Sequence, residues 1–230
     1  MSKVEQLSLS SFIKNGHPVH LYSYHSNLDV PLGVEIKNAN DILPQSQIFT
    51  YNTGSGKGSY SGFSNFFRYK LSSLKGGWWV DTDVVCLKPF DFPEDYVFAS
   101  EETLVKGKSQ ISSCIFKASK SSEIMTEAYN ICSKKNVSKI GWGETGPFLI
   151  EKLIKKHNLL DNVQDTTVFN PISYTKLNYF FEYRNFESTI NNSYSIHLWN
   201  EMWRRKKINK NKTFSHDSLI EYLKEKYLHS

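Results

Sequence analysis

The stretch GGWWVDTDVVCL, residues 76–87, places two aspartates one residue apart at the end of an apolar run. Residues i and i+2 of an extended strand share a face, so an extended backbone here would leave the side chains of Asp81 and Asp83 parallel. Two carboxylates that face the same way can ligate a hard divalent cation such as Mg²⁺ or Mn²⁺. Asp-x-Asp occurs often by chance in turns, so the neighbouring residues decide how strongly it indicates a cation site.

The residues around the two aspartates predict a helix, a glycine turn and a strand. Apolar residues at 63, 66, 67, 71 and 74 have helical spacing, and Gly76 and Gly77 would end that helix. Residues 78–80 then form a short, apolar strand that we expect to be buried. Ligands gather at the carboxyl ends of strands in open α/β sheets, so a ligand is expected at Asp81.

The rest of the chain alternates between helical and strand patterns, which favours an α/β fold. Ser2 and Glu5 form a capping-box pattern for a first helix that Gly16 would end. Asn38 or Asn40 can cap a short helix, and Pro147 suits the first position of another. Strands are expected at 18–24, 97–102, 111–118 and 194–199, and further helices at 121–132, 147–157 and 217–228.

Length and composition indicate one globular domain. The chain has 230 residues, 39% hydrophobic and 14% aromatic, enough for a substantial core. The three cysteines, at 86, 114 and 132, are too scattered for a disulfide framework and read as reduced thiols. Neither a signal peptide nor a spanning segment is recognisable, so we expect a cytoplasmic protein with at most peripheral membrane contact.

Two further segments have a biased composition. Residues 204–212 are basic and precede an amphipathic helix, which fits docking on the anionic inner face of a membrane or, alternatively, a solvated loop. No nucleic-acid-binding motif accompanies them, and the net charge is only +5. The glycine-rich residues 51–62 lack the spacing of a phosphate-binding loop and predict a mobile loop near the site.

The segment FSNFFRYKLSSLKGGWWVDTDVVCLKPFD, residues 63–91, with GETGP at 143–147 and IHLW at 196–199, resembles the DXD-motif glycosyltransferases. These include capsular polysaccharide and α-1,4 or α-1,6 sugar transferases. The resemblance implies a single GT-A-type domain over 1–230, a Rossmann-like mixed sheet flanked by helices. It also implies a retaining enzyme of polysaccharide biosynthesis that uses Mn²⁺ or Mg²⁺. The enzyme would move a hexose or N-acetylhexosamine from a nucleotide diphosphate sugar, a UDP-sugar, to a hydroxyl of a carbohydrate or lipid-linked glycan.

The same resemblance implies roles for individual residues at the donor. Asp81 would contact the ribose and sugar, and the metal through water, while Asp83 would ligate the metal directly. His197 would complete the metal or diphosphate site. Arg68 would reach the donor sugar or its phosphate, and Trp199, with Trp203, would lie in the segment that closes over the nucleotide.

On the acceptor side, Gly146 and Pro147 match a turn that borders the acceptor cleft, and Glu144 lies just ahead of it. Asn65 stands where relatives carry an acid that grips sugar hydroxyls; an amide can still hydrogen-bond them. Relatives also have an apolar strand before the first helix, whereas here the helix begins almost at Met1. These departures leave a non-catalytic sugar or nucleotide binder open, and V-D-T-D-V also fits a haloacid-dehalogenase-like phosphotransferase.

Overall fold

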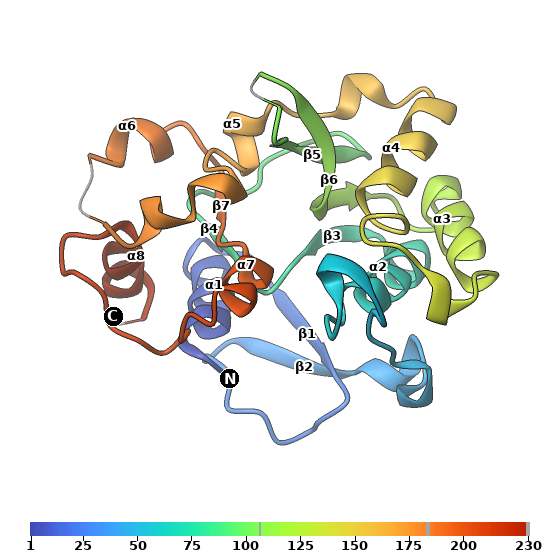
Figure 1. The fold of residues 1–230 in the computed structure, drawn as a ribbon, viewed down its shortest axis with the longest axis horizontal. Coiled ribbons are helices and arrows are strands. Elements are labelled where there is room, and N and C mark those ends of the chain that lie inside the picture. The colour runs from blue at the N-terminus through green and yellow to red at the C-terminus, as the bar shows by residue number, and fades with distance from the viewer. Residues whose placement is uncertain (106, 183–184, 229–230) are drawn as a thin grey trace.

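The strands of the computed structural model form small separate sheets within residues 1–105, 107–182 and 185–228, the part of the chain that the structure describes (Figure 1). One sheet is parallel and pairs β1 with β2, and a second, antiparallel sheet has the order β3-β6-β5. In a third, β4 pairs with β7 in antiparallel fashion. The strand bounds are β1 Val19–Ser23, β2 Val34–Asn38, β3 Gly77–Val80, β4 Val84–Cys86, β5 Val97–Glu102, β6 Ser109–Ala118 and β7 Ser195–His197.

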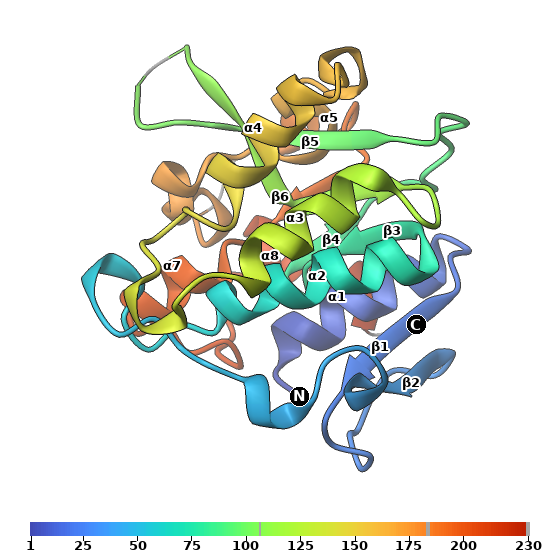
Figure 2. The ribbon, with the colours of Figure 1, turned by 90° about the vertical axis from the view of Figure 1, so that its right-hand side faces the viewer.

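Helices flank these sheets, so the expected mixed α/β fold class is confirmed. Figure 2 shows α2, α3 and α4 side by side over β3 and β6, whereas α1 and α8 pack against each other on the side of β4. The helix bounds are α1 Lys3–Lys14, α2 Ser61–Lys75, α3 Glu123–Ser133, α4 Pro147–Lys156, α5 Thr166–Phe169, α6 Glu187–Ile190, α7 Asn200–Arg205 and α8 Leu219–Leu228.

Serines on α1 hold β4 in place. The Ser8 hydroxyl donates to the carbonyl of Val84 at 2.6 Å, and the Ser11 hydroxyl accepts from the backbone N–H of Cys86 at 2.8 Å. β4 pairs with β7 along its other edge, so the two hydroxyls satisfy backbone groups that a further strand would otherwise pair. The helix therefore fixes the strand that begins directly after Asp83.

A glycine carries the chain from α2 into β3. Gly76 has φ +68°, and a Cβ there would come within 2.5 Å of the backbone nitrogen of Lys120. Only glycine fits this left-handed and crowded position without a backbone shift. The predicted helix end and strand start are confirmed, but Trp78 and Trp79 are half-buried, not buried as expected.

Other predicted elements are confirmed with small changes in their bounds. The capping box of α1 is present, Asn38 caps a short 3₁₀ turn, and Pro147 begins α4. The strand expected at 194–199 ends at His197, and the short helix α7 follows. The glycine-rich segment contains a 3₁₀ turn at Gly54–Gly56. Among the described residues, no helix combines the length and apolarity that crossing a membrane requires.

Candidate metal and donor site

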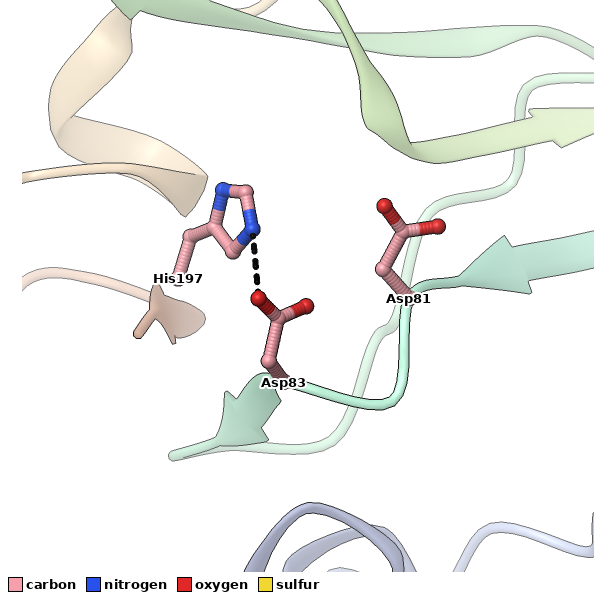
Figure 3. Close-up of side chains that lie close together, drawn as sticks. All are labelled: Asp81, Asp83 and His197. Atoms are coloured by element: carbon pink, nitrogen blue, oxygen red, sulfur yellow. Dashed lines mark hydrogen bonds and ion pairs between the residues drawn. The ribbon is translucent and has the colours of Figure 1, made fainter. Parts of the chain in front are cut away.

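Asp81, Asp83 and His197 converge at the junction of two sheets (Figure 3). One potential ligand atom from each lies within 4.8 Å of the other two. Asp81 directly follows β3, Asp83 directly precedes β4, and His197 is the last residue of β7. Because β4 and β7 pair with Val84 opposite His197, residues more than a hundred positions apart meet at one point.

A turn, not an extended strand, brings the two aspartates together. The backbone N–H of Val84 donates to the carbonyl of Asp81 at 3.0 Å, and the N–H of Asp81 donates to the carbonyl of Cys114 on β6 at 2.8 Å. The parallel side chains of an extended backbone are therefore not what the structure contains. The turn between β3 and β4 instead aims both carboxylates into the same space.

Arg68 of α2 lies against Asp81. Its Nη2 is 3.0 Å from Asp81 Oδ1, its Nη1 donates to the carbonyl of Ser113, and only 3% of its side chain is exposed. Its guanidinium also lies 5.1 Å from the ring centroid of Trp79, whose Nε1 donates to Asp81 at 2.7 Å. Burial raises the pKa of Asp81, and the nearby Asp83 charge adds to this, while Arg68 opposes it.

Asp83 is held by a histidine and a backbone N–H. His197 Nε2 lies 3.2 Å from Asp83 Oδ2, and the N–H of Asn200 donates to the same oxygen at 2.7 Å. Burial works against both charges, but each partner outweighs it for the other: the pKa of Asp83 is lowered and that of His197 is raised well above its ordinary value. The contact between the two side chains therefore favours the charged form of each.

The ring of Trp199 covers His197, and the backbone of Trp199 is strained. The two ring centroids are 3.9 Å apart, and Trp199 adopts φ +60° and ψ +52°, the left-handed region. Its Nε1 donates to the carbonyl of Ile172 at 2.8 Å, which holds the ring in place. Trp203, by contrast, is fully buried and donates to the carbonyl of Leu198. The sequence allows Trp203 to be either a core residue or part of a segment over the nucleotide, and α7 turns this side chain into the core.

Asn65 and Gly146 lie next to the Arg68 side of the site. Asn65 is buried, and its Nδ2 donates to Thr145 Oγ1 at 3.2 Å. A Cβ at Gly146 would lie 3.1 Å from Asn65 Nδ2, so the glycine allows this close approach. The predicted helix start at Pro147 therefore places the turn beside Asn65, and the acceptor roles of these residues stay predictions.

The side chain of Glu144 contacts residues of the segment between α3 and α4, to which it belongs. Its carboxylate pairs with Lys135 Nζ at 2.6 Å and accepts from the N–H of Gly141 at 2.8 Å, and 42% of its side chain is exposed. These hydrogen bonds lower the pKa of Glu144. The contacts fit a residue that stabilises the loop, and its predicted role toward an acceptor stays untested.

Sequence patterns missed two contacts of the site. Asn200 has no periodic or motif signal, since it directly follows a strand-like run. Trp79 looked like a core residue, yet its ring nitrogen binds Asp81. The order Trp-x-Asp on a strand contained the only signal, because side chains at i and i+2 lie on one face.

Comparison with known proteins supports the family inferred from the motif. A family model, the alpha 1,4-glycosyltransferase conserved region, matches residues 118–223, which include Gly146 and His197. A Homo sapiens alpha-1,4-N-acetylglucosaminyltransferase is 27% identical over 140 residues, 55% of this chain and 39% of the relative. The resemblance to glycosyltransferases is confirmed. The match therefore spans 39% of the length of that relative.

One solved structure, titled PaToxG Glycosyltransferase, has a TM-score of 0.45 and 12% sequence identity to this chain. The match covers 100% of this chain and 81% of that glycosyltransferase.

The donor atoms of the cluster fit a divalent cation. Carboxylate oxygens suit Mg²⁺ and Mn²⁺, and an imidazole nitrogen suits the transition metals. Asp83 and His197 are each about nine-tenths buried, while 25% of the Asp81 side chain is exposed, which leaves one side of the cluster open to a substrate. The three residues could therefore hold a cation between the protein and a bound ligand.

Proposed function

We propose that this protein is a retaining glycosyltransferase that moves a hexose or N-acetylhexosamine from a nucleotide diphosphate sugar, a UDP-sugar, to a carbohydrate hydroxyl. The observation that carries the proposal is the convergence of Asp81, Asp83 and His197, with Arg68 against Asp81. The family match at residues 118–223 supports the reaction class, and the arrangement of charge supports the donor class.

Asp83 and His197 would hold Mn²⁺ or Mg²⁺, with Asp81 at the open side of the cluster. Such a cation would neutralise charge on a diphosphate leaving group. Asp81, directed by Trp79 and Arg68, would bind hydroxyls of the donor. Arg68 would add positive charge near the departing diphosphate, and buried, preoriented groups of this kind cost little reorganisation during the reaction.

Asn65, Glu144, Gly146, Pro147 and Trp199 complete the proposed substrate site. Trp199 would cover the nucleotide side through its position on His197. Asn65, beside Gly146 and Pro147, would hydrogen-bond sugar hydroxyls on the Arg68 side, and Glu144 would border the acceptor. The acceptor itself is a glycan, free or lipid-linked.

Metal-dependent hydrolysis of a panel of nucleotide sugars tests the proposal. We expect at least one donor to be hydrolysed with Mn²⁺, and turnover to disappear in Asp83→Ala. Metal-independent binding of a nucleotide sugar with no turnover would instead identify a non-catalytic binder and overturn the proposal.

We also propose that the protein is cytoplasmic and that its basic segment, residues 204–212, makes peripheral contact with an anionic membrane. Arg204 and Arg205 both pair with Glu201, and Lys210 pairs with Glu5, so Lys206, Lys207 and Lys212 are the basic residues of this segment without an ion pair in the described contacts. Cosedimentation with liposomes should rise with the fraction of anionic lipid. A response that does not change with lipid charge would contradict membrane docking.

A further inference from the structure

Asn200 connects the candidate cation site to the first helix of the chain. Its backbone N–H donates to Asp83 Oδ2 at 2.7 Å, and its side-chain Nδ2 donates to Glu5 Oε1 at 3.1 Å. Glu5 lies on α1 and Asn200 is the first residue of α7. Asn200 therefore bridges the carboxylates of Glu5 and Asp83.

Glu5 is itself fixed from two sides. Lys210 pairs with the same Oε1 that accepts from Asn200, and the backbone N–H of Ser2 donates to Oε2 at 3.1 Å. Burial opposes the charge of Glu5, but the hydrogen bonds from Lys210 and Ser2 outweigh it and hold its pKa below the ordinary value. Glu5 is thus an ionised acceptor at neutral pH, presented to Asn200 in one geometry.

The segment that Glu5 holds is strained. Trp199, directly before Asn200, has a left-handed backbone, which is strained for a bulky residue and persists only where the surroundings impose it. Trp199 is anchored at Ile172 through its ring nitrogen, and Asn200 is anchored at Glu5 through its amide. Release of either anchor would let the backbone relax and turn the N–H of Asn200 away from Asp83.

The orientation of the Asn200 amide also depends on Glu5. Its Oδ1 is buried and has no hydrogen-bond partner among the described residues. A buried acceptor without a donor destabilises the folded protein. A flipped amide would place this oxygen against the acceptor oxygen of Glu5, so that acceptor selects the observed orientation in spite of the cost.

Resting on the proposed function, we propose that Glu5 is a positioning residue of the cation site and acts on Asp83 through Asn200. No atom of Glu5 needs to touch the cation or the donor. The N-terminal turn of α1, together with Lys210 after α7, orients Asp83 in advance. Removal of a residue that orients a metal ligand typically weakens metal binding by about 10- to 100-fold.

The positioning role of Glu5 is tested by Mn²⁺ binding to the full chain, measured by isothermal titration calorimetry without any donor. Glu5→Ala should raise the Kd for Mn²⁺ about 10-fold. Glu5→Gln keeps an acceptor for Asn200 and should restore most of the affinity. Glu35→Ala removes an equal charge from an exposed pair with Lys37 on β2 and should leave the Kd unchanged.

A second variant separates positioning from folding, because Glu5 also belongs to the capping box of α1. Asn200→Ala leaves that capping box intact but removes the amide that binds Glu5. It should weaken Mn²⁺ binding to a similar extent, and the double variant should lose little more than either single variant, since both act through one contact.

The outcomes are distinguishable. If wild type binds Mn²⁺, Asp83→Asn does not, and Glu5→Ala behaves as Glu35→Ala does, the positioning role is overturned while the proposed function stands. Full additivity of Glu5→Ala and Asn200→Ala would also overturn it. If wild type binds Mn²⁺ no better than Asp83→Asn, the metal dependence of the proposed function and the positioning role both fail.

Discussion

The buried part and the exposed rim of the candidate site are built differently. Buried Asp83 and His197 pair with each other, and buried Arg68 pairs with Asp81, through short contacts between separate strands and helices. Glu144 and the basic residues of α7 lie in exposed pairs with near neighbours in the sequence, such as Arg204 with Glu201. Buried pairs are costly to break, whereas exposed pairs contribute little, so the two regions should respond very differently to substitution.

The largest effect is expected at Asp83. Asp83→Asn keeps the size of the side chain but removes the charge that pairs with His197. Metal-dependent donor hydrolysis should fall by at least about 100-fold, the cost of removing one preoriented electrostatic group. A loss below about 5-fold would show that the buried region is not the reacting one.

Arg68 should show how much the buried pair stabilises the fold. Arg68→Ala leaves Asp81 without its cation and should lower the free energy of unfolding by about 3 kcal/mol in urea titrations. Arg204→Ala, which breaks an exposed pair, should cost at most about 1 kcal/mol. Equal losses in the two variants would contradict the contrast between the regions.

Gly146 lies where the two regions meet. A Cβ there would press on Asn65 Nδ2 from 3.1 Å, so Gly146→Ala should displace Asn65 from Thr145 and cost about 1 kcal/mol. At Gly141 a Cβ would meet only the Glu144 carboxylate, at 3.5 Å, which is an ordinary contact. Gly141→Ala should therefore be close to neutral when both variants are compared in urea titrations. A larger loss of stability at Gly141 than at Gly146 would contradict the close approach inferred at Gly146.

The smallest effect on stability is expected at Glu144. Glu144→Gln weakens an exposed pair with Lys135 and should change the free energy of unfolding by less than about 1 kcal/mol. If Glu144 borders the acceptor, transfer to a glycan should fall while donor hydrolysis stays constant. Loss of donor hydrolysis itself would place Glu144 at the donor and contradict its assignment to the rim of the site.

The elements that lead into the two aspartates were predictable from the sequence because their signals are local. The helix before Gly76, the strand after it and the Asp-x-Asp spacing are all contained in one short stretch, and the motif resemblance added Arg68 and His197. The turn at Asp81 was not predictable in this way, since the partner of its N–H, Cys114, lies on β6. Tertiary packing, not local propensity, decided that backbone.

The contacts of Asp83 beyond His197 could not be predicted from the sequence for the same reason. Asn200 and Glu5 have no spacing that relates them, and they meet only because α1 packs beside the chain that follows β7. β4 was missed because three residues between a turn and a proline-containing loop give too short a pattern. Its position depends instead on hydroxyls of α1, such as that of Ser8.

Binding of UDP to the full chain with and without Mn²⁺ tests whether Asp81, Asp83 and His197 hold a cation against a diphosphate. Mn²⁺ should strengthen UDP binding to wild type, because a cation at these residues would lie between the protein and the diphosphate, and Asp83→Asn should lose this enhancement. UDP that binds wild type equally well in Mn²⁺ and in a chelator, or an enhancement that survives Asp83→Asn, would contradict it.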